Sequence, residues 1–253
     1  MPEVLYEKRN RTAYITLNRP EAMNSMNSAL NRQFREALYE FRDDPEILVG
    51  IVTGAGDKAF CAGMDLKERN AANQGLAGPP VPSFLPEDVV WKPMIAAING
   101  FCLAGGLERA LTCDIRIAAD HATFGLPEPR WSLTASYGLH NLSRMIPLGE
   151  ALYIQLTGER INAQEALRIG LVHKVVPLAD LMAEAEKVAE SIKLCAPLAV
   201  SAIKQIVMTC RNLPVEYSYK FADSLAEKVR NSEDAKEGPR AFAEKRAPQW
   251  KGR

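Results

Sequence analysis

The sequence predicts an α/β protein with a buried, largely parallel sheet and a helical C-terminal third. Apolar runs of strand length, such as residues 47–53 and 94–98, follow helical or loop segments. Runs of this kind are typical of strands that are covered on both faces. From residue 178 onward the pattern is helical. With 253 residues, 47% of them hydrophobic, the chain is long enough to form a large core.

The N-terminal elements follow from local patterns. Residues 4–7 and 13–17 are short β-type runs, and the polar residues 8–11 between them predict a hairpin. Residues 27–42 carry apolar side chains at helical spacing, so they predict an amphipathic helix that ends at Pro45. A buried strand over 47–53 follows, and after the run 59–64 a second helix is expected to begin at Asp65.

Residues 70–88 contain two glycines and four prolines. This composition predicts a mobile surface loop. Long loops often cover a site, and they are also plain connectors. The sequence leaves both readings open here.

The remaining elements alternate before the chain becomes helical. We divide the chain into an α/β core over 1–195 and a C-terminal helical region over 196–253. Expected strands are 94–98, 115–118, 122–124 and 172–176; expected helices are 104–113, 139–156, 163–169 and the region after 178, with breaks at Pro197, Pro214 and Pro239.

Composition excludes several classes of function. Lysine plus arginine and aspartate plus glutamate both number 31, so the net charge is zero and nothing favours nucleic acid or an anionic membrane as a partner. The five cysteines form no CxxC pair and the three histidines are not at ligand spacing with them, so we expect reduced, mostly buried thiols and no metal. Without a signal-peptide pattern or a long apolar run, we expect a cytoplasmic protein.

Two glycine turns are candidates for binding an anion. Gly105 and Gly106 precede a predicted helix, whose first N–H groups lack partners within the helix, and glycine allows a ligand to approach them closely. Gly63 and Met64 repeat this arrangement. Two N–H groups aimed at one oxygen would stabilise an enolate or a tetrahedral oxyanion.

Two glutamates are candidates for proton transfer. Glu108 lies in the first turn after Gly105, among mostly apolar neighbours, and Glu128 is held between Pro127 and Pro129. From these positions alone, the better interpretation of both is a surface acid, Glu108 favoured by the helix dipole and Glu128 in a turn.

Several separate motifs resemble one family. They are KPMIAAING at 92–100, AGGLE at 104–108, CDIRIA at 113–118 and FGLPE at 124–128, together with LNRP at 17–20 and FCAGMDL at 60–66. In this order they resemble the enoyl-CoA hydratase/isomerase (crotonase) family across essentially the whole chain. The resemblance implies a crotonase-like spiral of repeated ββα units with a helical C-terminal trimerisation region, and trimers that commonly pair as hexamers.

The resemblance also implies an activity and a site. The activity is reversible hydration of a 2-enoyl-CoA to a 3-hydroxyacyl-CoA through an enolate, with the coenzyme A thioester as substrate and no tightly bound cofactor. Glu108 and Glu128 would be the catalytic pair, and the backbone N–H groups of Met64 and Gly105 would form the oxyanion hole. Coenzyme A would lie against Asn24, Ser25, Met26, Ala62, Asp65 and Leu66, with Lys245 reaching its phosphates, often from a neighbouring subunit.

Three departures from the family pattern concern the reacting end of the substrate. Residues 135–140 keep one glycine of a Pro-Gly-x-Gly-Gly-Thr run, and Leu126 replaces a common glutamine. Arg109 replaces an apolar residue, so it either pairs with Glu108 or faces a subunit contact, and we favour the contact. Trp131, Tyr137 and His140 are candidate acyl-pocket residues, although Trp131 is read first as a core residue and the other two have equally plausible structural roles.

Other functions remain open at this point. The same scaffold supports isomerases, specialised dehydratases and hydrolases. Having both glutamates favours hydration or dehydration over isomerisation by a single base. A non-catalytic relative that binds coenzyme A or RNA would be expected to lack the glutamates or to show a basic groove, and the sequence shows neither. The acyl group is not readable from the sequence.

Overall fold

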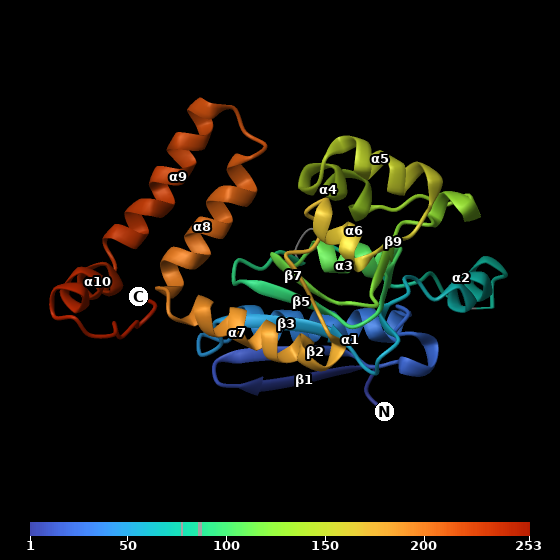
Figure 1. Ribbon diagram of the computed structural model, residues 1–253, viewed down its shortest axis with the longest axis horizontal. Helices are drawn as coiled ribbons and strands as arrows, with labels where there is room; N and C mark the ends of the chain where they lie inside the picture. The colour runs from blue at the N-terminus through green and yellow to red at the C-terminus, as the bar shows by residue number, and fades with distance from the viewer. Residues whose placement is uncertain (77, 86–87) are drawn as a thin grey trace.

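The computed structural model describes residues 1–76, 78–85 and 88–253, which form an α/β fold with two sheets (Figure 1). Within these residues, one sheet has the strand order β1-β2-β3-β5-β7-β10 and the other β4-β6-β8-β9. The predicted parallel sheet is confirmed, since every pairing is parallel except β1–β2 and β8–β9. The strands are β1 (Val4–Arg9), β2 (Thr12–Leu17), β3 (Val49–Gly54), β4 (Ala59–Cys61), β5 (Met94–Ile98), β6 (Phe101–Leu103), β7 (Ile115–Ala119), β8 (Thr123–Gly125), β9 (Ile161–Asn162) and β10 (Lys174–Val176).

The chain repeats a ββα unit, as the predicted spiral requires. In each of the units β3-β4-α2, β5-β6-α3 and β7-β8-α4, the first strand joins the larger sheet and the second joins the smaller one. The helices therefore begin near the same edge of the small sheet. They are α1 (Ser28–Asp43), α2 (Leu66–Asn73), α3 (Gly105–Leu111), α4 (Tyr137–Met145), α5 (Leu148–Thr157), α6 (Ala163–Arg168), α7 (Leu181–Lys193), α8 (Pro197–Cys210), α9 (Val215–Arg230) and α10 (Glu233–Ala243), with 3-10 turns at Pro20–Ala22, Glu128–Trp131 and Leu178–Asp180.

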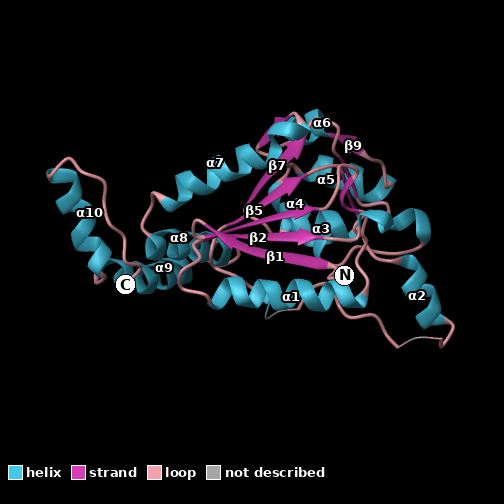
Figure 2. Cartoon of the chain, turned by 90° about the horizontal axis from the view of Figure 1, so that it is seen from below, coloured by secondary structure: helices cyan, strands magenta, loops and turns pink. Residues whose placement is uncertain are grey.

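Helices α1 and α7 cover opposite faces of the larger sheet (Figure 2). Helix α1 begins where predicted, because the side chain of Asn27 accepts a hydrogen bond from the Leu30 N–H at 2.8 Å. Its apolar stripe packs into the main core, while Leu181, Ala185 and Ala189 of α7 pack on the other face. The hairpin turn is tighter than predicted, with only Asn10 and Arg11 between the strands.

Two expected helix boundaries are wrong. The single helix predicted over 139–156 is two helices, because Pro147 has no N–H and forces Ile146 into an extended conformation at φ −126° and ψ 166°. Pro239, predicted to break a helix, lies inside α10. That helix is held at its start, where the Ser232 hydroxyl accepts the Ala235 N–H, and by the Asp234 carboxylate, which accepts two N–H groups from the C-terminal segment.

The segment predicted as a loop over 70–88 is partly ordered by hydrogen bonds. Residues 70–73 complete α2, and Val81, Pro82 and Ser83 bond to α1 or α3. Its prolines include Pro86, which lies outside the described residues. Whether the segment moves stays a prediction.

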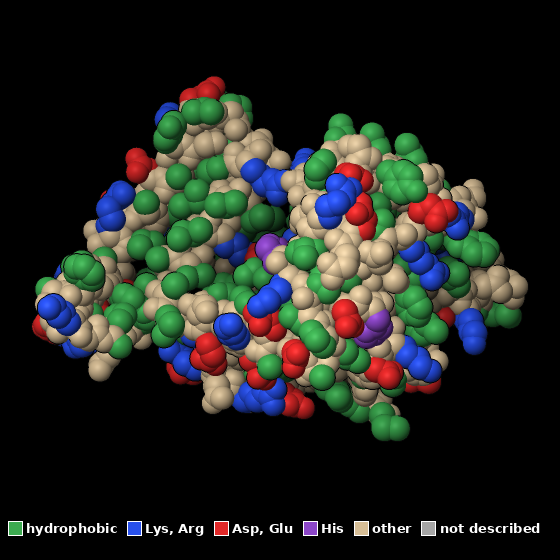
Figure 3. All heavy atoms as spheres, in the orientation of Figure 1, with side chains coloured by type: hydrophobic (Ala, Val, Ile, Leu, Met, Phe, Trp, Pro, Cys, Tyr) green, Lys and Arg blue, Asp and Glu red, His purple; other side chains and the backbone are tan. Residues whose placement is uncertain are grey.

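Helices α8, α9 and α10 extend away from the two sheets as an arm (Figure 1). Apolar side chains gather on the face of this arm that Figure 3 shows. Among the described residues, no single helix is long and apolar enough to cross a membrane, and α7 with α8 passes that test only as a pair bent by 104°. The proposed boundary at residue 196 stays a prediction. The exposed apolar residues of the arm include Ile203, Val207, Val215, Tyr217 and Tyr219.

Candidate active site

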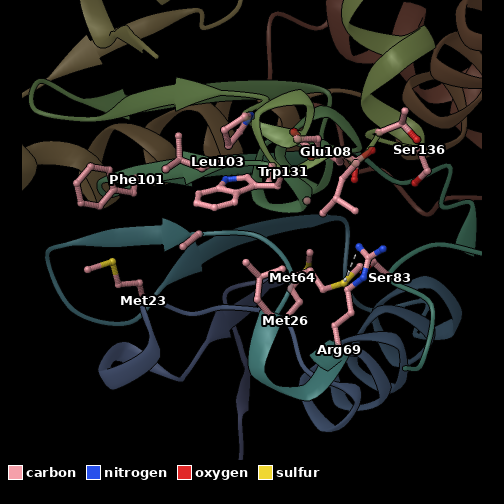
Figure 4. A pocket seen from close by; sticks show the side chains of 18 of the residues that line it. Met23, Met26, Met64, Arg69, Ser83, Phe101, Leu103, Glu108, Trp131 and Ser136 are labelled. Atoms are coloured by element: carbon pink, nitrogen blue, oxygen red, sulfur yellow. Dashed lines mark hydrogen bonds between the residues drawn. The ribbon is translucent and has the colours of Figure 1, made fainter. Parts of the chain in front are cut away.

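A cavity of about 640 Å³ opens where the second strands of the units end and their helices begin. Figure 4 shows its two walls, one from the N-terminal third of the chain and one from β6, α3 and the turn after β8. The first wall includes Met23, Met26, Met64, Arg69 and Ser83, and the second includes Phe101, Leu103, Glu108, Trp131 and Ser136.

The two glycine turns predicted to form an oxyanion hole lie side by side in this cavity. A Cβ placed on Gly63 would lie 3.4 Å from the Gly105 nitrogen, and one on Gly105 would lie 3.9 Å from the Gly63 Cα. Met26 and Met64 form an isolated parallel β-bridge, in which the Met26 N–H donates to the Gly63 carbonyl and the Asp65 N–H donates to the Met26 carbonyl. Neither bond uses the Met64 N–H. Among the described residues neither the Met64 nor the Gly105 N–H has an acceptor, so both are free to donate to a ligand.

The backbone around these amides is constrained. Gly63 has φ +101°, a conformation that favours glycine. Ala104, just before the second amide, has φ 51° and ψ −130°, which is costly for a residue with a side chain. It is held there by its N–H bond to the Gly125 carbonyl at 2.9 Å, and Gly106 packs so closely that a Cβ would lie 2.1 Å from the Cys61 oxygen. These contacts fix the direction of the Gly105 N–H.

Glu108 is buried, with 6% of its surface exposed, and lies on the cavity wall. Its Oε1 accepts the Gly138 N–H at 2.6 Å, at the first turn of α4. This hydrogen bond ties the carboxyl group of Glu108 to the first turn of α4. Gly138 is the single glycine that residues 135–140 retain from the family pattern, and the structure gives that glycine this contact.

Glu128 is also buried, with 9% exposed, but its surroundings differ. Its Oε2 has no hydrogen-bond partner among the described residues. Burial raises the pKa of its carboxyl to about 7; its own backbone N–H opposes this shift, and the negative charge of Glu108 adds to it. The cavity thus contains one carboxyl group that accepts a backbone N–H and one whose pKa is raised to about 7.

The predicted coenzyme A segments are brought to the cavity only in part. Met26, Ala62 and Leu66 line it, while Asp65 caps α2 and pairs with Arg19 at 3.0 Å. The Ser25 carbonyl also accepts from Arg19. Asn24 corrects the prediction: its side chain is fully buried, with Nδ2 donating to the Ala55 and Ala59 carbonyls and Oδ1 accepting the Arg19 N–H, so that side chain is not free to contact a ligand.

The remaining predicted site residues divide into three places. Trp131 is 68% exposed and lines the cavity, so the core position read first for it is wrong. Tyr137 and His140 line a second cavity behind the first. Lys245 is exposed just past α10, at the far end of the arm from α2 (Figure 1), so within one chain it does not meet the other residues.

Neither expected role of Arg109 is correct. Arg109 is buried, with 2% exposed, and no ion pair joins it to Glu108 within the part of the chain that the structure describes. Its guanidinium carbon lies 3.8 Å from the Phe34 ring centroid and 5.2 Å from that of Phe84. Nη2 donates to the Asn31 Oδ1 and the Ser83 carbonyl, both at 3.2 Å. It is therefore an internal clamp between α1, α3 and residues 83–84.

Two arginines of the cavity wall were missed from the sequence. Arg69 of α2 and Arg160, whose guanidinium lies 5.6 Å from the Phe101 ring, have no acidic partner at ion-pair distance among the described residues. Such cations suit phosphate groups. A signal for Arg69 was present, since it follows the predicted coenzyme-binding residue Asp65 by one helical turn. No comparable local signal marks Arg160.

Comparison with known proteins decides the family. A family model described as enoyl-CoA hydratase/isomerase matches residues 7–253. The chain belongs to the enoyl-CoA hydratase/isomerase family. It is 44% identical over 259 residues to an (E)-benzylidenesuccinyl-CoA hydratase from Thauera aromatica and 43% identical over 267 residues to a carnitinyl-CoA dehydratase from Escherichia coli K12, covering 100% of both chains in each case.

Comparison with solved structures supports the same family assignment. An enoyl-CoA hydratase from Mycobacterium tuberculosis H37Rv superposes with a TM-score of 0.93 at 39% identity, and an enoyl-CoA hydratase from Bacillus anthracis with 0.89 at 34%. The first covers 100% of both chains; the second covers 99% of this chain and 100% of the other. The protein is therefore a hydratase-like enzyme of the crotonase fold.

Proposed function

We propose that the protein catalyses the reversible addition of water to a 2-enoyl-CoA, giving a 3-hydroxyacyl-CoA. The observation that carries this proposal is the contrast between two buried carboxyl groups on one cavity. Glu108 accepts a backbone N–H, whereas Glu128 has a pKa raised to about 7 by burial. Hydration needs one group that takes a proton and one that gives a proton.

The thioester oxygen is expected to lie between the Met64 and Gly105 N–H groups. Adding water at Cβ pushes electrons through the conjugated system onto this oxygen, so negative charge develops there. Two fixed N–H donors stabilise that charge, and losing one such donor typically costs about 3–4 kcal/mol. The unused amides and the constrained Ala104 support this step.

The glutamates then divide the protons. Glu108 accepts a proton from water as the oxygen bonds to Cβ, and protonated Glu128 transfers its proton to Cα as the enolate collapses. Afterwards Glu108 carries a proton and Glu128 is ionised, so exchange with solvent resets both. Dehydration runs the same steps backwards, with ionised Glu128 removing the Cα proton.

Coenzyme A is proposed to enter along the wall formed by Ala62 and Leu66. Arg69 and Arg160 supply cations for its phosphates, and Lys245 would contribute only from a neighbouring subunit. The relatives named above act on coenzyme A thioesters with quite different acyl groups, which is consistent with a shared thioester site and a variable acyl site. The cytoplasmic location expected above belongs to the same proposal, and cell fractionation checks it.

The test is a comparison of isomeric substrates. Crotonyl-CoA loses the absorbance of its conjugated thioester on hydration, whereas a 3-enoyl-CoA gains it on isomerisation. We expect turnover of crotonyl-CoA to 3-hydroxybutyryl-CoA, identified by mass spectrometry. Isomerisation of the 3-enoyl-CoA without hydration would replace the proposal with a single-base isomerase, and binding without turnover would replace it with a coenzyme A-binding role.

The pH dependence of the two directions is expected to be the same. Hydration starts with Glu128 protonated and Glu108 ionised, and dehydration starts with the reverse, so both directions need one proton on the pair. In both directions kcat is therefore expected to fall about tenfold per unit as pH rises above the Glu128 pKa of about 7. Initial rates of crotonyl-CoA hydration and 3-hydroxybutyryl-CoA dehydration from pH 5 to 9 check this. Rates that stay constant above pH 7 would show that the proton on Glu128 is not needed for the reaction.

Helices α8 and α9 of the arm are proposed to mediate self-association, as a homotrimer or a dimer of trimers. It carries the exposed apolar residues listed above, and large apolar patches usually mark contacts. We expect light scattering to give a trimer or hexamer, and an Ile203→Lys/Val207→Lys variant to give smaller species. Lysines at Ser224 and Glu227, exposed polar positions of α9, are the matched control. A native protein that is monomeric at working concentration would contradict this.

A further inference from the structure

A second cavity of about 520 Å³ lies behind the acyl end of the first. The two cavities share the wall residues Ser83, Phe84 and Ser136. Two acidic groups of the second cavity are already paired, Asp88 with Arg35 at 3.0 Å and Asp114 with Lys204 at 2.8 Å. Its remaining lining is mainly apolar and aromatic, and includes Leu38, Val90, Trp91, Met94 and Met208. An apolar ligand group therefore suits this space better than a charged one.

The wall between the cavities contains a pair of stacked rings. The Phe84 and Tyr137 rings have centroids 5.0 Å apart and planes 17° apart. Tyr137 is the first residue of α4, next to Gly138, whose N–H binds Glu108. The stack is thus attached to the same turn that holds the catalytic carboxylate, at the end of the first cavity where the acyl group would react.

Arg109 fixes Phe84 in this stack. It follows Glu108 on α3, donates to the carbonyl of Ser83, and presents its guanidinium face to the Phe84 ring. Its opposite contact is the Phe34 ring of α1. The Arg109 guanidinium also donates to Met26 Sδ and Asn31 Oδ1. Its contacts are therefore all within the protein, and it does not form an anion site. The planar guanidinium of arginine can stack on the aromatic rings and donate these hydrogen bonds at the same time, which the ammonium group of lysine cannot do.

We propose that the Phe84–Tyr137 stack, held by Arg109, is the partition that limits the acyl group to a short chain, and that the second cavity behind it takes longer apolar or aromatic acyl ends once the partition is reduced. This rests on the proposed hydratase function. Phe84 and Tyr137 are then specificity-determining residues, and Arg109 is a positioning residue. None of the three takes part in proton transfer.

The test is the ratio of kcat/KM for 2-octenoyl-CoA to that for crotonyl-CoA, with cinnamoyl-CoA as the aromatic case. Phe84→Ala is expected to raise both ratios at least tenfold. Leu85→Ala is the matched control, because Leu85 lies on the same segment but lines only the second cavity, so its ratios are expected to stay at the native value. Unchanged ratios in Phe84→Ala would overturn the proposal. If Phe84→Ala does not fold, Phe84→Leu is measured, with a smaller rise in the same direction expected.

Arg109 is tested by Arg109→Leu and Arg109→Lys. Both are expected to raise the octenoyl ratio through a lower KM for octenoyl-CoA, with kcat for crotonyl-CoA changed much less. A purely structural role would lower both rates together and leave the ratio unchanged, which would remove Arg109 from the proposal. If Arg109→Lys showed the native octenoyl-CoA to crotonyl-CoA ratio, a positive charge alone would be sufficient, and the proposed positioning role of the guanidinium would be wrong.

Binding separates this proposal from the proposed reaction. If the native protein does not hydrate crotonyl-CoA, the proposed function fails, and the partition is then judged by calorimetric Kd values for butyryl-CoA and octanoyl-CoA. The native protein is expected to prefer butyryl-CoA, and Phe84→Ala to reverse or abolish that preference. The same preference in both proteins would overturn the partition by itself.

Discussion

A Glu128→Gln variant is expected to hydrate crotonyl-CoA about 10²–10⁴-fold more slowly than the native protein, and yet to be more stable at pH 8. The loss follows because an amide cannot give its proton to Cα. The gain follows because the native protein at pH 8 holds a charged carboxylate in a buried site where its Oε2 has no described donor. For this reason, replacing a catalytic group often stabilises the folded protein.

The sign of the stability effect can be stated from the pKa. Burial raises the Glu128 pKa from 4.5 to about 7, so the folded protein holds a proton there that the unfolded chain has released. Between these values the native free energy of unfolding falls as pH rises, and above about pH 7 the deficit is complete. The glutamine variant lacks this dependence. It should therefore unfold at a higher temperature than the native protein at pH 8, with the difference disappearing toward pH 4.5.

Calorimetry at pH 5 and pH 8 checks the stability, and the crotonyl-CoA assay checks the rate. Glu21→Gln, at an exposed position, is the control for losing a carboxylate at the surface. A hydration rate close to native would remove Glu128 from the mechanism. A stability difference that is equal at both pH values would show that the side chain is not held protonated by burial.

The strands were the most predictable part of the fold. Residues 94–98 are apolar at every position, and they form a strand with the predicted bounds because both of its faces are covered. The sequence pattern did not reveal the helix break at Pro147, because apolar residues at helical spacing continue on both sides of it. The continuity of α10 through Pro239 depends on bonds from the C-terminal segment, which no local pattern reveals.

The candidate site was predictable only where a local pattern marks each of its residues. Two glycine turns before helices were enough to predict neighbouring amides, and the structure brings them together. The environment of Arg109 comes from α1 and from residues 83–84, so its neighbours along α3 gave the wrong partners. Likewise Asn24 matched a family segment, but contacts with residues 55 and 59 use its side chain.

A Glu108→Gln variant is expected to lose hydration by a similar factor, about 10²–10⁴-fold, while keeping one partial reaction. The variant's amide oxygen can still accept the Gly138 N–H, so the turn at α4 should be retained, but the group that takes a proton from water is gone. The oxyanion amides and Glu128 are untouched. Exchange of the Cα protons of butyryl-CoA with D₂O needs only those groups, because it involves an enolate but no water addition.

Mass spectrometry of butyryl-CoA after incubation in D₂O therefore separates the two glutamates. Deuterium incorporation is expected with the native protein and with Glu108→Gln, and is expected to be lost with Glu128→Gln. Equal loss in both variants would mean that the carboxyl groups act as one coupled unit, and that the different hydrogen bonding seen around them does not divide their roles. Retention in Glu128→Gln with loss in Glu108→Gln would reverse the assignment, because it would make the carboxylate beside Gly138 the group that faces Cα.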